Sequence, residues 1–207
     1  MSRKKQTVKL TVIAILLAIA ILLQAMASLI VFPITNSSPA LSFIPIVVGA
    51  ILYGPGVGAL LGFVWSGFIL VSGQASYYMG MNAIGTVITV IAKGTSAGLV
   101  SGLVYKGLKN KNKVVAIIIA SIVAPLVNSL LYRVGLVTFF REYFFGKAND
   151  KGLSPIAYFV VAFTSASFFL EVGLSAIFSP IIVRICNIAT NMLGLEQEEV
   201  IEDEDEE

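Results

Sequence analysis

The residues of this chain that could do chemistry are polar side chains set among long apolar stretches. Inside a membrane such groups are costly unless they are paired or bind something. Aromatic walls, amide hydrogen bonds and one guanidinium suited to a carboxylate would together form an outward-facing cup for a small solute. The candidates for such a binding site are Asn36, Trp65, Gln74, Tyr77, Tyr78, Asn82, Asn128 and Arg133. The alternative is that the tyrosines are interfacial anchors and that Arg133 extends outward to water.

Two further charged residues, Lys93 and Glu171, fall near the middle of apolar segments. A charge at that depth must face protein or water. We expect Lys93 and Glu171 either to form a buried ion pair between two helices or to contact a ligand.

Catalysis and metal binding find little support in the sequence. The chain has no histidine and only one cysteine, Cys186, so the usual base of a serine nucleophile and any Cys/His metal cluster are missing. There is no GxxxxGK[ST] loop for a nucleotide. We therefore predict no enzyme activity, no catalytic residues, no metal site and no cofactor. A basic stripe with interleaved aromatic residues, as nucleic-acid binding would need, is also missing.

Composition indicates the medium in which the chain folds. Of its 207 residues, 57% are hydrophobic and only 13% are charged, whereas soluble domains are about 25% charged. We therefore predict an all-α membrane protein, a compact bundle of about six transmembrane helices.

The expected spans follow from the apolar runs. We predict a first span over 8–31, a second and a third within 41–71, a fourth over 82–105, a fifth over 114–140 and a sixth over 155–185. Gly54-Pro55-Gly56 divides the second from the third, which begins at about residue 57. Pro180 is the expected place for a break in the long sixth span. The external connections are expected to be loops over 34–39, 72–81 and 141–154.

Small residues recur every fourth position in two of these segments, at Gly54, Gly58 and Gly62 and at Gly94, Gly98 and Gly102. This spacing lets another helix approach closely.

Basic clusters predict the orientation. Lysine and arginine are concentrated at the N-terminus and in the connection after the fourth span, at Arg3, Lys4, Lys5, Lys9, Lys106, Lys109, Lys111 and Lys113. Positive charge favours the cytoplasmic side, so we expect both termini to be cytoplasmic. Residues 1–190 should form one integral-membrane domain, followed by a disordered acidic cytoplasmic tail over 191–207.

The order and spacing of several segments resemble the substrate-binding S component of an energy-coupling factor (ECF) transporter. These segments are Ile44 to Ile46, Tyr53 to Ala59, Asn82 to Thr86, Lys93 to Gly102 and Ala124 to Ser129, together with the pair Ala14 and Ala18 in the first span. The resemblance implies high-affinity capture of a vitamin or related micronutrient in the plasma membrane of a prokaryote. It also implies delivery inward with a membrane coupling (T) subunit and two ATPases. Ala14 and Ala18 match the alanine motif that docks on the coupling subunit, and the external loops and outer helix halves would hold the substrate.

The pattern around Pro45 and Gly54-Pro55 is similar to riboflavin and pantothenate members, and the Lys93-Gly94 stretch and the segment from Glu171 to Arg184 are nearer the pantothenate type. Pantothenate is therefore the expected cargo, followed by riboflavin or folate. The alternative is a stand-alone ion-coupled secondary transporter of a small anionic solute, which would work without any coupling ATPase. An integral-membrane enzyme acting on lipid and a purely structural membrane partner are more remote alternatives.

Overall fold

The computed structural model describes residues 3–29, 41–163 and 166–193, and it is helical throughout, with no strand among these residues. The described helices are α1 (Arg3–Leu29), α2 (Phe43–Tyr53), α3 (Pro55–Val71), α4 (Ser76–Met81), α5 (Ala83–Leu108), α6 (Lys113–Phe139), α7 (Arg141–Asp150), α8 (Pro155–Phe163) and α9 (Ala166–Leu193). The all-α prediction is confirmed.

Four of the described helices contain segments long and apolar enough to cross a membrane: Gln6–Ser28 in α1, Ala83–Leu108, Lys113–Phe139 and Val172–Met192 in α9. α2 and α3 are also apolar but shorter. Large apolar side chains are exposed along the outside of the bundle, for example Leu22 on α1, Leu103 on α5 and Ile177 on α9. Such surfaces suit a lipid environment and not water.

The division of the second apolar stretch is confirmed. α2 ends at Tyr53 and α3 begins at Pro55, with Gly54 between them at φ 89°. Glycine adopts this left-handed conformation without a steric penalty, and proline is favoured at the first helical position. The chain therefore reverses within a single residue.

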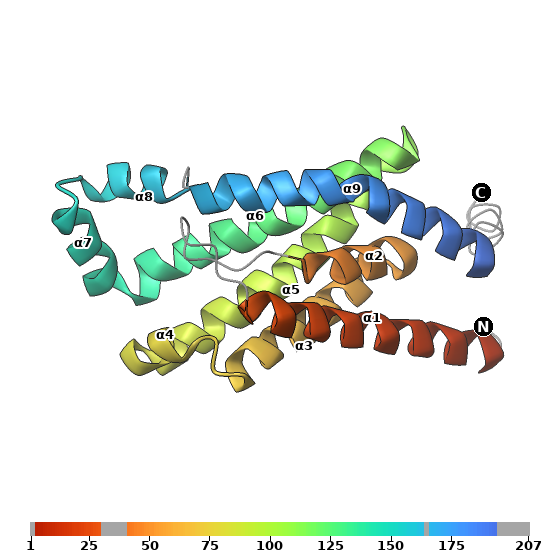
Figure 1. Ribbon diagram of the computed structural model, residues 1–207, viewed down its shortest axis with the longest axis horizontal. Coiled ribbons are helices and arrows are strands. Elements are labelled where there is room, and N and C mark those ends of the chain that lie inside the picture. Colours follow the sequence, from red (N-terminus) through yellow and green to blue (C-terminus); the bar gives the residue numbers. More distant parts are fainter. Residues whose placement is uncertain (1–2, 30–40, 164–165, 194–207) are drawn as a thin grey trace.

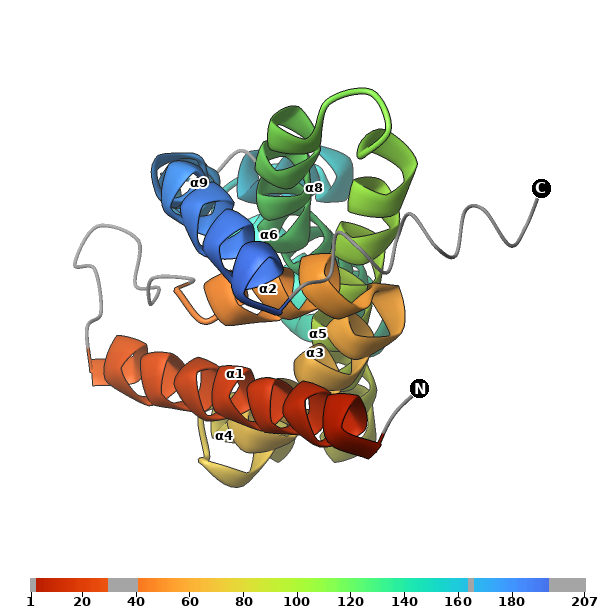
Figure 2. The same cartoon turned by 90° about the vertical axis from the view of Figure 1, so that its right-hand side faces the viewer.

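α2 is the central helix of the bundle. It lies between α1 and α9 when the molecule is viewed from its end (Figure 2), and it also contacts α3, α5 and α6. Ile46, Val47 and Val48 are almost completely buried. Because α2 is surrounded by protein, its near-continuous apolar sequence fills a core and does not face lipid.

The two glycine stripes pack against each other. A Cβ atom added at Gly58 would meet the carbonyl group of Gly98, and one added at Gly62 would meet the carbonyl group of Gly94. A Cβ atom at Gly102 would lie 2.7 Å from Cα of Pro55. The prediction that these stripes admit a close helix is confirmed, and the structure identifies α3 and α5 as the partners.

The prediction of a break in the sixth span at Pro180 is wrong, and residues 164 and 165 of that span lie outside the described part of the chain. α8 ends at Phe163, α9 begins at Ala166, and α9 continues through Pro180 to Leu193, beyond the predicted domain boundary at residue 190. Proline deprives the carbonyl group four residues earlier of its amide donor. Here that carbonyl belongs to Ala176, and the hydroxyl of Ser179 donates to it over 2.8 Å. The acidic residues 194–207 lie outside the described part of the chain.

Two of the expected external loops contain helices. α4 occupies most of 72–81 and α7 most of 141–154. In α7, Phe144 and Ala148 lie one turn apart and are 3% and 1% exposed. This short apolar stripe packs onto the bundle. The sequence predicted a loop here because the surrounding residues are polar and charged. The predicted loop over 34–39 lies outside the described residues.

The connections and chain ends gather at two opposite ends of the bundle. In Figure 1 the start of α1, the end of α9 and the turn between α5 and α6 lie at one end of the molecule, and α4 and α7 lie at the other. The first end carries the lysines of the α5–α6 turn: Lys106, Lys109, Lys111 and Lys113.

Candidate functional site

A cavity of about 110 Å³ lies between α4, α5, α6 and the end of α3. Its polar and aromatic lining consists of Gln74, Tyr78, Thr86, Thr89, Lys93, Tyr132 and Phe140. Its apolar lining consists of Ile69, Ala75, Val90 and Leu136. A small concave site with apolar walls and few polar groups is typical of solute recognition.

Two helical stripes position this lining. On α5, Thr86, Thr89 and Lys93 are spaced by three and four residues, so they project from one face. On α6, Tyr132 and Leu136 are spaced by four residues, and Phe140 follows at the end of the helix. α5 begins where the Asn82 side chain accepts a hydrogen bond from Gly85 N (2.8 Å), and the Asn82 amide donates to Phe139 O (3.2 Å). Asn82 thus caps α5 and ties it to the end of α6.

Aromatic rings close the cavity on the α4 side. The Tyr78 and Tyr132 hydroxyls are 2.6 Å apart, and the Tyr78 ring lies edge-on to Phe140 with ring centres 5.4 Å apart. Tyr143 of α7 adds a further edge contact to Tyr78 at 6.0 Å. Burial, followed by the neighbouring Tyr132 phenol, raises the pKa of Tyr78 far above its usual value. This phenol therefore stays protonated at neutral pH and can donate a hydrogen bond.

Lys93 lies at the other end of the cavity. Its Nζ atom is 5.6 Å from the centre of the Tyr132 ring and 5.9 Å from the centre of the Trp65 ring. Aromatic faces stabilise an ammonium group at such distances. Lys93 is the one charged side chain among the described residues that line the cavity.

A buried hydrogen-bond network connects the cavity wall to α1. Gln24 Oε1 accepts from Trp65 Nε1 (3.1 Å) and from Ser42 Oγ (2.8 Å). Gln24 Nε2 donates to Oε1 of Gln74 over 2.7 Å, and Gln74 lines the cavity. Gln24 is only 9% exposed, so its three bonds are shielded from water.

The structure brings some of the predicted binding residues together and not others. Gln74 and Tyr78 line the cavity, as does Lys93. Trp65 is 3% exposed and lies behind Lys93 in the core, next to Phe43. Tyr77 is 60% exposed and packs on Tyr78 from outside the cavity.

Arg133 and Asn128 of α6 are not among the lining residues. Arg133 is 8% exposed and its Nη1 atom donates to Ser129 O of the preceding turn (2.8 Å), so it does not extend to water. Asn128 Oδ1 is buried without a hydrogen-bond partner among the described residues. Asn36 and the side chain of Glu171 lie outside the described part, so their roles and the pairing of Lys93 with Glu171 stay predictions.

Sequence reasoning overlooked Thr86, Thr89 and Tyr132. The spacing of residues on α5 could have identified Thr86 and Thr89, because both share a helical face with Lys93. Tyr132 is harder to identify from the sequence. It is adjacent to Arg133, and the two side chains project from different faces of α6, so the choice of Arg133 selected the wrong face. Gln24 gave no signal, because a single glutamine in an apolar span has no spacing partner.

The pair predicted to dock on a coupling subunit lies on the surface. Ala14 and Ala18 are both exposed on α1, whereas Ala20 and Ala27 of the same helix are buried against the bundle. The outer face of α1 therefore presents two small residues one turn apart.

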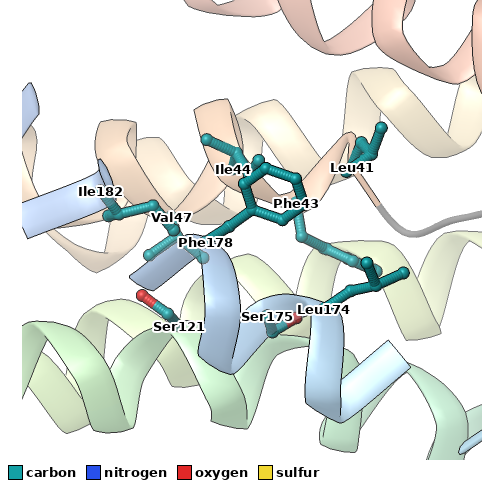
Figure 3. Close-up of a pocket in the computed structure, with 9 residues that line it drawn as sticks. All are labelled: Leu41, Phe43, Ile44, Val47, Ser121, Leu174, Ser175, Phe178 and Ile182. Carbon is teal, nitrogen blue, oxygen red and sulfur yellow. The ribbon is translucent and has the colours of Figure 1, made fainter. Parts of the chain in front are cut away.

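Two other hollows lack the features of a specific site. A groove of about 320 Å³ between α6, α7 and α8 is apolar except for Thr138, whose hydroxyl donates to Val134 O (2.9 Å) within its own helix. A gap of about 10 Å³ between α2, α6 and α9 is lined mostly by apolar side chains, such as Phe43, Val47 and Phe178, and Ser121 lies at its edge (Figure 3). That gap has room for about one water molecule.

Comparison with known proteins identifies the family. The sequence model of the family described as "ECF transporter, substrate-specific component" matches residues 8–183, which include α2 to α8 and most of α1 and α9. No curated protein and no solved structure matches the chain. Members of this family are membrane transport proteins, and the long apolar helices of this chain suit that setting. The chain therefore belongs to the family of substrate-specific components of ECF transporters.

Proposed function

We propose that this protein captures a vitamin or related micronutrient outside a prokaryotic cell and passes it inward with a coupling (T) subunit and two ATPases. The family match over residues 8–183 carries this proposal. The chain has no nucleotide-binding loop of its own, which suits a division of labour in which the partners hydrolyse ATP. The same match favours this function over a stand-alone ion-coupled transporter.

The cavity between α4, α5 and α6 is the proposed binding site. It lies toward the end of the bundle that carries α4, away from the lysine-rich turn between α5 and α6 (Figure 1). Because lysines favour the cytoplasmic side, we propose that the lysine-rich end faces the cytoplasm. The cavity then lies near the outer surface, where a capture protein meets its substrate.

Pantothenate is the proposed cargo, followed by riboflavin or folate. The cavity of about 110 Å³ is smaller than the ~300–1,000 Å³ typical of sites for drug-sized ligands. A small, flexible, partly polar molecule such as pantothenate suits this space better than the larger ring systems of riboflavin and folate.

The test is direct binding by the purified full chain in detergent. Trp65 is the only tryptophan, and its ring faces the ammonium group of Lys93, so its fluorescence should report occupancy of the cavity. We expect one member of a panel of pantothenate, riboflavin and folate to bind tightly and saturably, with 1:1 stoichiometry in native mass spectrometry. If a demonstrably folded sample binds no vitamin of a wider panel, the capture function is wrong.

A further inference from the structure

The acidic residues of this chain are concentrated at its C-terminus. The sequence has 12 acidic residues, of which Glu142, Asp150 and Glu171 precede residue 196 and the other nine fall within 196–207. Glu142 and Asp150 belong to α7, at the end of the bundle opposite the α5–α6 turn (Figure 1). Glu171 lies about six turns before the end of α9, or about 33 Å along the helix axis. Among the residues that form the described helices, no acidic residue therefore lies near the lysine-rich end.

The basic residues gather at that lysine-rich end. Nine of the chain's 14 basic residues belong to it: four between residues 3 and 9 at the start of α1, the four lysines of the α5–α6 turn, and Arg184 of α9. Lys106 and Lys111 are exposed. Lys113, at the start of α6, lies close enough to Cys186 of α9 to act on its thiol electrostatically. The helices thus bring an excess of positive charge together on one surface.

The acidic segment 196–207 begins within reach of this surface. α9 ends at Leu193, at the same end of the bundle as the α5–α6 turn (Figure 1), and Glu196 follows three positions later. The residues from 196 to 207 can span up to about 40 Å when extended. Nine carboxylates then match nine basic groups in number and are opposite to them in sign. Such charges attract one another over about 8 Å at physiological salt.

We propose that the acidic segment 196–207 docks on the lysine-rich end of the bundle, the surface formed by the start of α1, the α5–α6 turn and the end of α9. The docked segment neutralises this surface and competes there with anionic lipid headgroups, which are attracted to lysines clustered beside a membrane helix. The chain thus limits how strongly its own lysine-rich end binds an anionic membrane. This inference does not depend on the capture function.

Carbodiimide cross-linking of the full chain tests the contact, because the reagent joins a carboxylate to an amine only when the two groups touch. The protein is placed in nanodiscs of neutral phosphatidylcholine at about 0.01 M and about 1 M salt, where the Debye length is about 30 Å and about 3 Å. At low salt we expect mass spectrometry to find links within one copy from 196–207 to the lysines of the α5–α6 turn. These links should be lost at high salt, and phosphatidylglycerol should reduce them at low salt.

The opposite end of the bundle supplies the controls for cross-linking. Lys147 Nζ lies 3.9 Å from Asp150 Oδ2, so this pair should react and shows that the reagent is active. Lys147 and Lys151 should form no link to the acidic segment, because they lie beyond helices that cross the bilayer.

A spin label on the acidic segment gives a readout that does not depend on lysine chemistry. The label is attached to V200C in a C186S background, and we expect it to be less mobile at low salt than at high salt. Replacing the four lysines of the α5–α6 turn with glutamine should release the label at low salt. K147Q/K151Q, at the opposite end of the bundle, is the matched control and should change nothing. If the four-lysine variant does not fold, a chain whose acidic residues in 196–207 are changed to glutamine or asparagine takes its place.

Each outcome decides the proposal. Links to the lysine-rich end at low salt, with a label that is released when its lysines are neutralised, support docking. A label equally mobile at both salt concentrations, with no such links, shows a solvated tail and overturns docking. Links that persist at high salt, or that form only between two copies, also overturn it. Links that phosphatidylglycerol leaves unchanged overturn the competition with anionic lipid.

Discussion

Gln24 shows how one polar side chain can organise an otherwise apolar contact between helices. α1 presents much of its surface to lipid, yet Gln24 meets Trp65 of α3, Ser42 before α2 and Gln74 before α4. A buried amide of this kind is stabilising only when its own bonds and those of its partners are complete. It therefore specifies where α1 lies against the bundle.

Replacing Gln24 with leucine should destabilise the protein. The change removes the acceptor for two buried donors, Trp65 Nε1 and Ser42 Oγ, and an unsatisfied buried group costs about 1–3 kcal/mol. We expect a loss of about 2 kcal/mol or more, seen as a lower unfolding temperature in detergent. Gln6→Leu, at an exposed position of the same helix, is the control. Equal unfolding temperatures for the two variants would show that the network contributes nothing.

At the scale of the helical elements, the close approach of α3 and α5 is the feature on which the cavity depends. Their glycines bring the two backbones into contact, and this contact aligns α5 so that Thr86, Thr89 and Lys93 face the cavity. Backbone atoms cannot move aside as flexible side chains can, so the contact tolerates little added volume.

Gly98→Leu should therefore disrupt the fold. A side chain at this position would overlap the Gly58 carbonyl group, whereas one at Gly107 of the same helix meets nothing within 4 Å. We expect Gly98→Leu to cost about 3 kcal/mol, at the upper end of overpacking effects, or to prevent folding. Gly107→Leu should be close to neutral. Thermal unfolding followed by circular dichroism compares them, and similar curves would contradict the proposed contact.

At the scale of the whole molecule, the proposed binding site and the proposed docking surface are formed by different helices. The cavity lies between α4, α5 and α6, whereas the exposed alanines lie on the outer face of α1. The Gln24 network connects α1 to the cavity wall but does not include these alanines. A change on the outer face of α1 can therefore affect partner binding without touching the cavity.

Replacing Ala14 or Ala18 with tryptophan tests this separation. The bulky ring should block close docking of a coupling subunit, so uptake should be lost while vitamin binding by the isolated protein is unchanged. Val8→Trp, at an exposed position more than one turn before Ala14 on α1, should preserve both. Uptake with the partners and fluorescence binding are measured on the same variants. A parallel loss of binding and uptake would mean that these alanines only support the fold of α1.

Much of the architecture could be predicted from local sequence. Apolar runs of sufficient length indicate helices in a membrane because every backbone group must be paired there. Gly54-Pro55 indicates a turn because only glycine adopts its conformation without strain and proline begins helices. The glycine spacing indicated two close-packing faces. These signals arise within one or two helical turns, and sequence shows them directly.

Local sequence therefore predicts the medium, the helices and their faces of close approach. It does not predict which side chains share a cavity, because that depends on how α5 and α6 are rotated about their own axes in the packed bundle. That rotation is set by contacts between distant segments, such as Gly58 with Gly98 and Gly135 with Thr89. It turns Lys93 and Tyr132 inward and buries Arg133 against its own helix. The continuity of α9 through Pro180 has a local cause instead: the Ser179 hydroxyl donates to the Ala176 carbonyl, which Pro180 leaves without a backbone donor.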